Sequence, residues 1–502
     1  MTHSTERTLH LLFWSLIFIV FPLGRLPDTL VRAFPTSVAD FQEEEQIETL
    51  VPKVITFVLL WGLGVALVVW RARRLWRDGL PPLRLLAGLV PPPAQATFCW
   101  LGAFIFALIA ASFFSPANLN FGLPFLSNQF ESVVIKLLES AWYSLALIAA
   151  VLASSRVLPL HVPLTMMVSG AALVGLWTVA EAHGFEPMSL LDPATQLRTN
   201  LLASMGHQAY VSAFVGVALV FWFAWRALSA QLRLVDGVLV TILAAALVAS
   251  GGRAGLLAAV MVLGILIGYI VFYMQRYRTR VLLLSVLALG AGFGVVQTSS
   301  HAQFRMGRIG AAVQGEDANV SHRMILWDVA TQAIMERPLT GHGAYALANV
   351  VWPLATPEQA DTLMREFLPE PIAKDALRVG KLAIYTHPET GNLTLTAMNP
   401  YGVHNYFLDI AFASGLPAAF LFMGFLLSCS RLLYRAHTPL ALATLLALTT
   451  YLLYGMFWFA TQNVDPLIWA LVGLGVGSVP RTLGSAEVEK GRAQGLQVAS
   501  SS

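Results

Sequence analysis

The chain has 502 residues, of which 57% are hydrophobic and 12% are charged, and its mean hydropathy is +0.67. This composition excludes an ordinary soluble globular protein and indicates an integral membrane protein. The formal net charge of +3 says little about partners, because the distribution of Lys and Arg matters more than their sum, and we expect no nucleic acid among them.

Apolar runs of spanning length, or slightly shorter, predict about twelve transmembrane helices. The runs are too long and too uniformly apolar for the alternating strands of a barrel, so the predicted fold class is an all-α polytopic membrane protein. They lie near residues 9–25, 52–70, 95–115, 133–154, 159–181, 206–225, 235–250, 254–274, 281–297, 403–434, 439–460 and 464–479.

These runs divide the chain into four parts. We predict nine membrane helices in residues 1–297, a large loop with short helices in 298–402, three further helices in 403–479, and a disordered tail in 480–502. The first run resembles a signal-peptide core, but no small-x-small cleavage site follows it closely, so we expect a retained span. Cys99 and Cys429 both lie within apolar runs, so we expect neither a disulfide nor a thiolate metal site.

The basic residues between the runs predict the orientation of the chain. In the alternating arrangement they fall on one side, which the positive-inside rule makes cytoplasmic. Both termini then face the cytoplasm, and the large loop lies on the external face. The residues concerned are Arg71, Arg73, Arg74, Arg77, Arg226, Arg233, Arg276, Arg278, Arg280, Arg431 and Arg435.

Within the large loop, we predict a helix that Ser321 caps and that ends near Glu336, before Pro338. Its apolar stripe would comprise Leu326, Ala330, Ala333 and Ile334. The helix is expected to lie along the membrane surface, with Trp327 at the interface and with His322 and Arg323 in the first turn, where free N–H groups favour anions. Residues 358–381 mix acidic and basic side chains and predict a solvated, partly helical cap.

Arg253 is the basic residue that most needs an explanation. It lies in Ser250-Gly251-Gly252-Arg253-Ala254-Gly255, a glycine-rich break between two apolar runs, where a guanidinium is costly unless it meets an anion or water. It either snorkels to lipid phosphates or binds a phosphate through its planar fork, with the glycines allowing a close approach. For Arg198 the same two readings stay open, and for Arg305 and Arg308 simple head-group contact is favoured.

His404 follows the polar loop and precedes an apolar run, so it lies at the depth of a lipid head group. Position alone favours a structural histidine over a catalytic one. His322, His342, His387 and His404 are not spaced as metal-ligand pairs on one helix, and we expect no metal and no cofactor. Neither a Gly-x-Ser-x-Gly elbow nor a nucleotide-binding Gly-x-x-x-x-Gly-Lys loop occurs. If the protein is an enzyme, its donor must arrive already activated.

Three motifs taken together resemble the O-antigen ligase and polymerase superfamily of bacterial inner-membrane glycosyltransferases. They are Ser250-Gly251-Gly252-Arg253, the series Arg323…Trp327…Pro338-Leu339-x-Gly341-x-Gly343, and His404-Asn405 followed by Gly415. The resemblance runs from about Arg198 to Pro417, and the first half of the chain matches only in hydropathy. Ala418 stands where the family has Gly, Thr or Tyr, a departure that bears on the ligase-specific assignment.

The resemblance implies a donor glycan carried on undecaprenyl pyrophosphate. His404 would be the general base, with Asn405 in support, and Arg253 and Arg323, with Arg198, would hold the pyrophosphate in place of a metal ion. Trp327, Gly341 and Gly343 would support the site. Direct displacement would invert the anomeric centre.

The leading interpretation is an O-antigen ligase that uses lipid A-core as acceptor, spans the bacterial inner membrane among its lipids, and has its active site facing the periplasm. A polymerase of O-antigen or exopolysaccharide and a protein O-oligosaccharyltransferase are the alternatives within the superfamily. An alternative from another class is a transporter of lipid-linked glycans, for which repeated halves and charged groups at mid-membrane would be expected, and the sequence displays neither.

Overall fold

The computed structural model describes most of the chain. The described residues are 3–25, 41–81, 85–114, 128–193, 203–313, 318–344, 346–368, 372, 376–380, 382–386, 392–398, 400 and 402–480.

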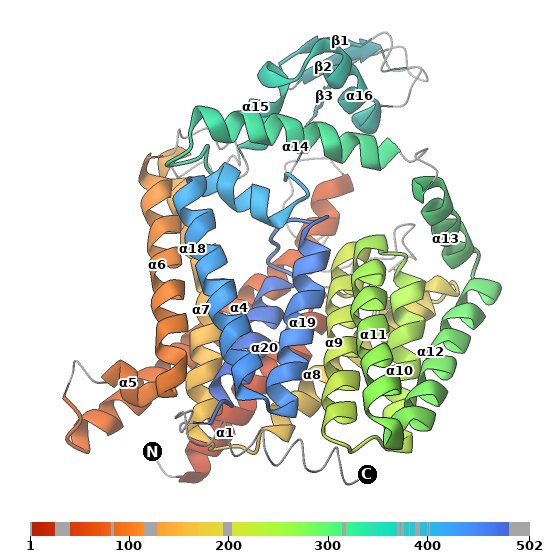
Figure 1. Cartoon of the computed structure of the whole chain (residues 1–502). Helices are drawn as coiled ribbons and strands as arrows, with labels where there is room; N and C mark the ends of the chain where they lie inside the picture. Colours follow the sequence, from red (N-terminus) through yellow and green to blue (C-terminus); the bar gives the residue numbers. More distant parts are fainter. Residues whose placement is uncertain are drawn as a thin grey trace.

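The fold is a bundle of long apolar helices with a small module on one end (Figure 1). In the described part of the chain, nine helical segments are long and apolar enough to cross a membrane, and three shorter apolar helices, α10, α19 and α20, accompany them. Each of the twelve predicted apolar runs coincides with one of these segments, so the predicted all-α polytopic fold is confirmed.

The helices of the bundle have the following bounds: α1 His3–Ser15, continued by a π-helical turn Leu16–Val20 and α2 Phe21–Leu23; α4 Phe41–Arg77; α5 Leu85–Leu89; α6 Gln95–Phe114; α7 Asn128–Ser155; α8 His161–Ala182; α9 Gln208–Leu228; α10 Leu234–Ser250; α11 Arg253–Tyr273; α12 Arg278–Thr298; α18 Tyr406–Ala436; α19 Pro439–Gly455; α20 Asp465–Gly477.

Helix α9 lies at the centre of the bundle and contacts α8, α10, α11 and α19. Close helix contacts depend on small residues, as is usual where lipid gives no hydrophobic drive for association. A Cβ atom on Gly473 or Gly477 of α20 would lie 2.2 or 2.4 Å from a carbonyl oxygen of α7. These glycines therefore let α20 and α7 pack with their backbones almost in contact.

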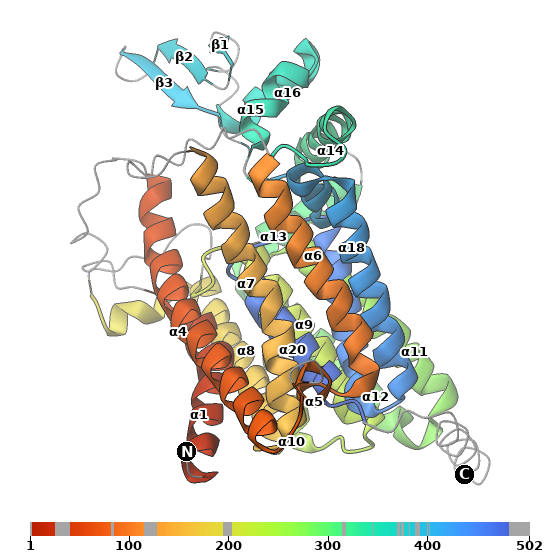
Figure 2. The same cartoon turned by 90° about the vertical axis from the view of Figure 1, so that its left-hand side faces the viewer.

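The module on the end of the bundle is formed by the predicted large loop (Figure 2). It comprises α13 Ser300–Val313, α14 Ala318–Glu336, α15 Leu347–Leu354, α16 Pro357–Phe367, and the strands β1 Leu377–Val379, β2 Leu382–Thr386 and β3 Leu393–Ala397. Helix α14 lies across the bundle end (Figure 1). We call this end of the bundle the site end.

The predicted stripe of α14 is buried, with Leu326, Ala330 and Ala333 at 0% exposure and Ile334 at 5%. This stripe packs with α15, α16 and Phe412 of α18 into a hydrophobic core separate from that of the bundle. The predicted N-terminus was wrong by one turn, because the helix begins at Ala318 and Ser321 lies inside it. Arg323 therefore lies in the second turn.

Residues 377–397 contain an antiparallel sheet of order β1-β2-β3 that was not predicted. Its strands have only three and five residues, which is too short for a reliable alternating pattern. Tertiary packing stabilises the sheet: Ala383 is fully buried, and the Arg378 guanidinium lies 5.6 Å from the centre of the Trp352 ring of α15. Helix α16 supplies the expected helical part of the cap.

Helix α18 is broken at Gly415, whose φ of +83° is left-handed, and Pro417 follows. The turn after α14 docks on this break through backbone hydrogen bonds. The amides of His342 and Gly343 donate to the carbonyls of Phe412 and Ala413 over 2.8 and 3.0 Å, and the amide of Leu416 donates to that of Pro338 over 2.7 Å. The module is thus attached where the first two turns of α18 bend away from the rest of the helix.

The basic residues used to predict orientation gather at the opposite end of the bundle. Helices α4, α9, α11 and α18 all run from the site end to that far end. The arginines lie near the C-terminal ends of these helices, in the connections that follow, or in the first turn of α12. Helix α20 also runs toward the far end, where α1 begins (Figure 1). One end of the bundle is therefore rich in arginine, and the other carries the module.

Candidate functional site

His404 lies in a tight turn just before α18. It has a φ of +56°, a left-handed conformation that costs a residue with a Cβ atom about 1–2 kcal/mol. Its Nδ1 lies 3.0 Å from the carbonyl oxygen of Gly402. Because a carbonyl can only accept, Nδ1 carries the hydrogen in the neutral ring and donates, and Nε2 keeps its lone pair. The turn therefore presents His404 in the tautomer that can take up a proton at Nε2.

Two aromatic side chains from the segment between α19 and α20 enclose the His404 ring. The rings of Trp458 and Phe459 meet it nearly at right angles, with centroids 5.1 and 5.2 Å away. Gly402 packs directly on Phe459, since a Cβ atom there would lie 2.8 Å from the ring. A larger residue at position 402 would displace the turn that carries His404.

Asn405 caps the N-terminus of α18. Its Oδ1 accepts from the amides of Phe407 and Leu408, each over 3.1 Å, and its Nδ2 donates to the carbonyl of Met456 over 3.2 Å. Asn405 thus joins the start of α18 to the segment that carries Trp458. Asn405 therefore supports His404 by fixing the backbone of the turn, and its side chain bonds Met456, Phe407 and Leu408.

A buried carboxylate lies beneath this segment. Asp465, at 0% exposure, accepts from the hydroxyls of Tyr406 and Tyr451, the indole of Trp469 and the amide of Thr461 over 2.7–3.2 Å. These donors come from α18, α19, α20 and the connection between α19 and α20. The carboxylate therefore ties together the elements that hold the His404 turn.

The environment of His404 is cationic. The Arg323 guanidinium of α14 lies 5.9 Å from the centre of the Trp458 ring. Burial, and next the Arg323 charge, lower the pKa of His404 to about 3. Burial and Arg323 also lower the pKa of His322 to about 4. Neutral imidazoles beside an arginine make a site whose electrostatic field favours an anion.

Arg253 is the first residue of α11, directly after the predicted glycine break. Gly251 has a φ of +65°, and a Cβ atom on Gly252 would lie 2.2 Å from Oγ of Ser212 in α9. The break is confirmed, and the close approach that its glycines permit is between α9 and α11. Arg253 thereby sits at a helix N-terminus at the site end, where the N–H groups also favour an anion.

Arg305 of α13 joins this region. Its aliphatic stem packs on Gly251, where a Cβ atom would lie 2.7 Å from the Arg305 Cγ. Burial, followed by the Arg305 charge, lowers the pKa of His207 to about 4. The sequence favours ordinary head-group contact for Arg305, and the structure places it beside the Arg253 turn and near the N-terminus of α9.

His207 is a residue that the sequence analysis missed. It caps α9, with Nδ1 accepting from the amide of Ala209 over 3.1 Å, and its ring stacks on Trp458 at 5.1 Å and 28°. The indole of Trp458 thus lies between the imidazoles of His207 and His404. One signal was available, because His207, like His404, immediately precedes an apolar run.

The other predicted residues have different outcomes. Arg198 and His387 lie outside the described residues, as does the side chain of Arg308. Trp327 lies half-buried beside Phe457, with ring centroids 6.4 Å apart.

Gly341 and Gly343 have left-handed φ values of +66° and +100° in the turn that docks on α18. A Cβ atom on Gly341 would lie 2.6 Å from the backbone of Ala413, so only glycine lets the turn approach α18 this closely. The turn holds α14, and with it Arg323, over the site.

The residues that the structure describes contain no group of three or more His, Cys, Asp and Glu side chains that could hold a metal ion. The site brings together His404, His207 and Arg323 around Trp458, with Arg305 and the Arg253 turn beside His207. Such an arrangement can bind a phosphate-bearing ligand next to a proton acceptor.

The comparisons with known proteins agree with this chemistry. A search of the curated proteins finds no match to the chain. The family described as O-antigen ligase matches residues 238–370. The matched region contains Arg253, Arg323, Trp327, Gly341 and Gly343, and it ends before His404. Residues 238–370 therefore carry an O-antigen ligase domain, and this match supports the O-antigen ligase superfamily, whose members are glycosyltransferase-type enzymes.

Proposed function

We propose that the protein is an O-antigen ligase: a metal-independent, inverting glycosyltransferase that moves a glycan from undecaprenyl pyrophosphate onto lipid A-core. The observation that carries this proposal is His404, held with Nε2 free to accept a proton and enclosed beside the Arg323 guanidinium. The family match over residues 238–370 supports the reaction class.

The reaction needs one proton transfer and one displacement. The acceptor hydroxyl gives its proton to Nε2 of His404 while its oxygen attacks the anomeric carbon of the donor. The bond from that carbon to the pyrophosphate oxygen breaks, and the electron pair leaves with the pyrophosphate. Since the nucleophile enters opposite the leaving group, the anomeric configuration inverts. A positioned base contributes about 10²–10⁴-fold to such a step.

The arginines are assigned to the leaving group. Arg323 and Arg253, together with Arg198, would donate to the non-bridging oxygens and neutralise the charge that develops on the pyrophosphate. We add Arg305, because its stem packs on the turn that carries Arg253.

Donor binding would also make His404 a better base. Burial and Arg323 lower its pKa to about 3. The pyrophosphate brings negative charge next to these cations, and a nearby negative charge raises the pKa of an imidazole. Proton transfer to His404 is thereby favoured when the donor is in place.

The distribution of arginine supports the proposed sidedness. The far end of the bundle carries the basic residues and by the positive-inside rule would be cytoplasmic. The site end and the module would then face the periplasm of a bacterial inner membrane, and both termini would be cytoplasmic.

The acceptor separates this proposal from its nearest alternative, a polymerase that extends a carrier-linked glycan. We favour lipid A-core because the charged outer surface of the module includes exposed Arg365 on α16, whose guanidinium suits a phosphate of the head group. The same surface supports lipid A-core over a protein acceptor.

The test is reconstitution of the purified protein in vesicles with an undecaprenyl-pyrophosphate glycan, with and without lipid A-core, followed by mass analysis. A ligase joins glycan to core and yields free undecaprenyl pyrophosphate, and the His404→Ala variant does neither. A ladder of extended carrier-linked glycan in the absence of core would identify a polymerase instead. The same vesicles without any ion gradient distinguish a transferase from a transporter.

A further inference from the structure

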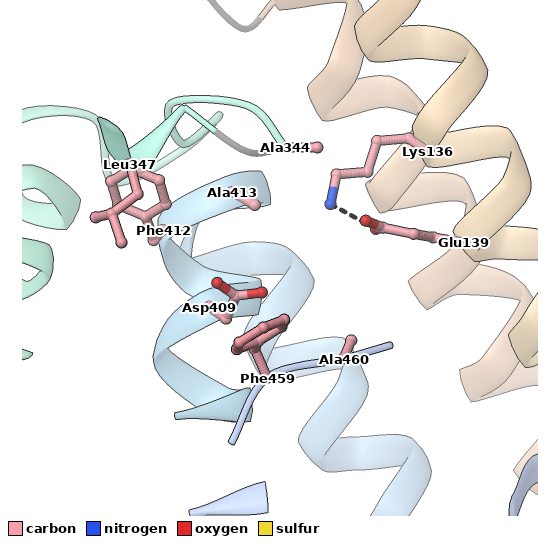
Figure 3. A pocket seen from close by; sticks show the side chains of 9 residues that line it. All are labelled: Lys136, Glu139, Ala344, Leu347, Asp409, Phe412, Ala413, Phe459 and Ala460. Atoms are coloured by element: carbon pink, nitrogen blue, oxygen red, sulfur yellow. Dashed lines mark hydrogen bonds and ion pairs between the residues drawn. The ribbon is translucent and has the colours of Figure 1, made fainter. Parts of the chain in front are cut away.

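A small polar cavity adjoins the His404 site (Figure 3). Lys136 and Glu139 of α7 line it together with Asp409 of α18, and Phe459 forms part of its wall. The same Phe459 ring contacts His404. Water can occupy about 20 Å³ of the cavity, which is room for about one water molecule and too little for a sugar ring. Its charged groups therefore need an explanation other than binding a substrate sugar.

These charges are placed where they are costly. Lys136 is 4% exposed and lies within an apolar segment of α7 that is long enough to span a membrane. Its Nζ lies 2.6 Å from Oε2 of Glu139, so Glu139 holds the ammonium group at the cavity. Buried ionisable residues in membrane helices are usually paired and usually serve the function of the protein. The ammonium shares this cavity with two carboxylates, because Asp409 also lines it (Figure 3).

Asp409 reaches the His404 turn directly. Its Oδ1 accepts from the amide of Val403 over 3.3 Å, and Val403 immediately precedes His404. The left-handed backbone of His404 persists only if its surroundings hold it. The Asp409 bond acts on one side of the turn, the Phe459 ring packs against Gly402, and Asn405 caps the helix that follows.

We propose that Asp409 is a positioning residue for His404, and that Lys136, anchored by Glu139, holds the Asp409 carboxylate in place. The proposal rests on the proposed function, since it takes His404 as the base. A purely structural alternative is an acidic residue that stabilises the positive N-terminal end of α18. That alternative predicts a less stable protein with normal turnover per folded molecule, whereas a positioning residue changes turnover itself.

The test compares Asp409→Ala with Asp409→Asn and Lys136→Met. Alanine removes the acceptor of the Val403 amide, and a misplaced base lowers kcat on the order of ten- to a hundredfold, with the KM for the donor nearly unchanged. Asparagine keeps an oxygen at this position and should restore kcat to within about threefold of wild type. The kcat of Lys136→Met should lie between those of Asp409→Ala and Asp409→Asn.

A matched control is Asp236→Ala at the far end of the bundle. Asp236 is 1% exposed and accepts from Nε of Arg226 over 3.2 Å, so its loss also breaks a buried ion pair, but far from His404. This control should lose stability and keep its kcat per folded molecule. An Asp409→Ala protein that behaves like the control, with normal kcat, would overturn the proposal.

A second measurement does not depend on transfer activity. Diethyl pyrocarbonate modifies neutral imidazoles, and mass spectrometry of the peptide that contains His404 gives the rate at this residue alone. If Asp409 positions the ring, Asp409→Ala raises the rate at His404 and Asp409→Asn leaves it near wild type. An unchanged rate in both variants overturns the positioning role. Should the wild-type protein transfer no glycan, the proposed function fails while this rate still decides the role of Asp409.

Discussion

Asp465 and His404 both contact the segment between α19 and α20, and they are held in opposite ways. Asp465 is fully buried and accepts four hydrogen bonds from three helices and the segment itself. His404 has a left-handed backbone and neighbours that oppose its protonation. The carboxylate beneath the site is therefore satisfied by hydrogen bonds, whereas the His404 turn is strained and lies beside a cation that favours an anionic ligand.

Replacement of Asp465 should reduce the stability of the protein more than any other change considered below. Asp465→Ala removes the acceptor of the Tyr451 hydroxyl, the Trp469 indole and the Thr461 amide, all in a buried region. Orphaned buried donors cost about 1–3 kcal/mol each, so we expect a loss of at least about 3 kcal/mol in unfolding free energy. A thermal melt in detergent measures it. An unchanged Tm would show that the network is not what holds this segment.

His404 should show the reverse behaviour. His404→Ala is expected to lower the transfer rate at least about a hundredfold, because the general base is lost. His404→Gly should be as inactive, but its Tm should not fall, because glycine adopts a φ of +56° without strain. Steady-state transfer assays and melts on both variants provide the test. Near wild-type turnover in either variant would remove His404 from the mechanism.

Arg253 tests whether the cations at the site act through geometry or through charge alone. Arg253→Lys keeps the charge but loses the planar fork, so we expect a drop in kcat/KM of at least about tenfold, close to that of Arg253→Ala. Transfer should persist in excess EDTA for the wild-type protein. Loss of activity with chelator and its return with magnesium would contradict the metal-free account.

A smaller effect is expected on protonation, because the binding of a pyrophosphate should be coupled to proton uptake by the imidazoles. Burial, and next the charges of Arg323 and Arg305, lower the pKa of His404 to about 3 and those of His207 and His322 to about 4. A bound pyrophosphate raises these pKa values, so binding takes up protons, and affinity should increase as pH falls from 7 toward 5.

The measurement is calorimetric titration with a pyrophosphate diester, which has no proton of its own to exchange near neutral pH. Titrations in two buffers of different ionisation enthalpy give the number of protons taken up. The His322→Gln variant should take up fewer protons than the wild type. A proton count of zero at pH 5.5 would show that the anion does not bind beside these histidines.

Features that depend on a local pattern could be predicted from the amino-acid sequence. Long apolar runs can satisfy their backbone in lipid only as helices, and each predicted run is a helix. The stripe on α14 repeats at the helical period, and the break before Arg253 follows from two adjacent glycines. The resemblance in motifs also identified the superfamily, which the match over residues 238–370 confirms.

Which side chains meet could not be predicted in this way, because it depends on how the helices pack. His207 and His404 are far apart in the sequence, and Trp458 comes between their rings only because α9, α18 and α19 converge at the site end. Asp409 and Lys136 come together in the same way, on separate helices beside one cavity. The short strands of the module likewise depend on packing against Trp352. Such contacts follow from how helices pack and bend, and no pattern within a single segment encodes them, because each partner is chosen by burial and hydrogen bonding across the fold.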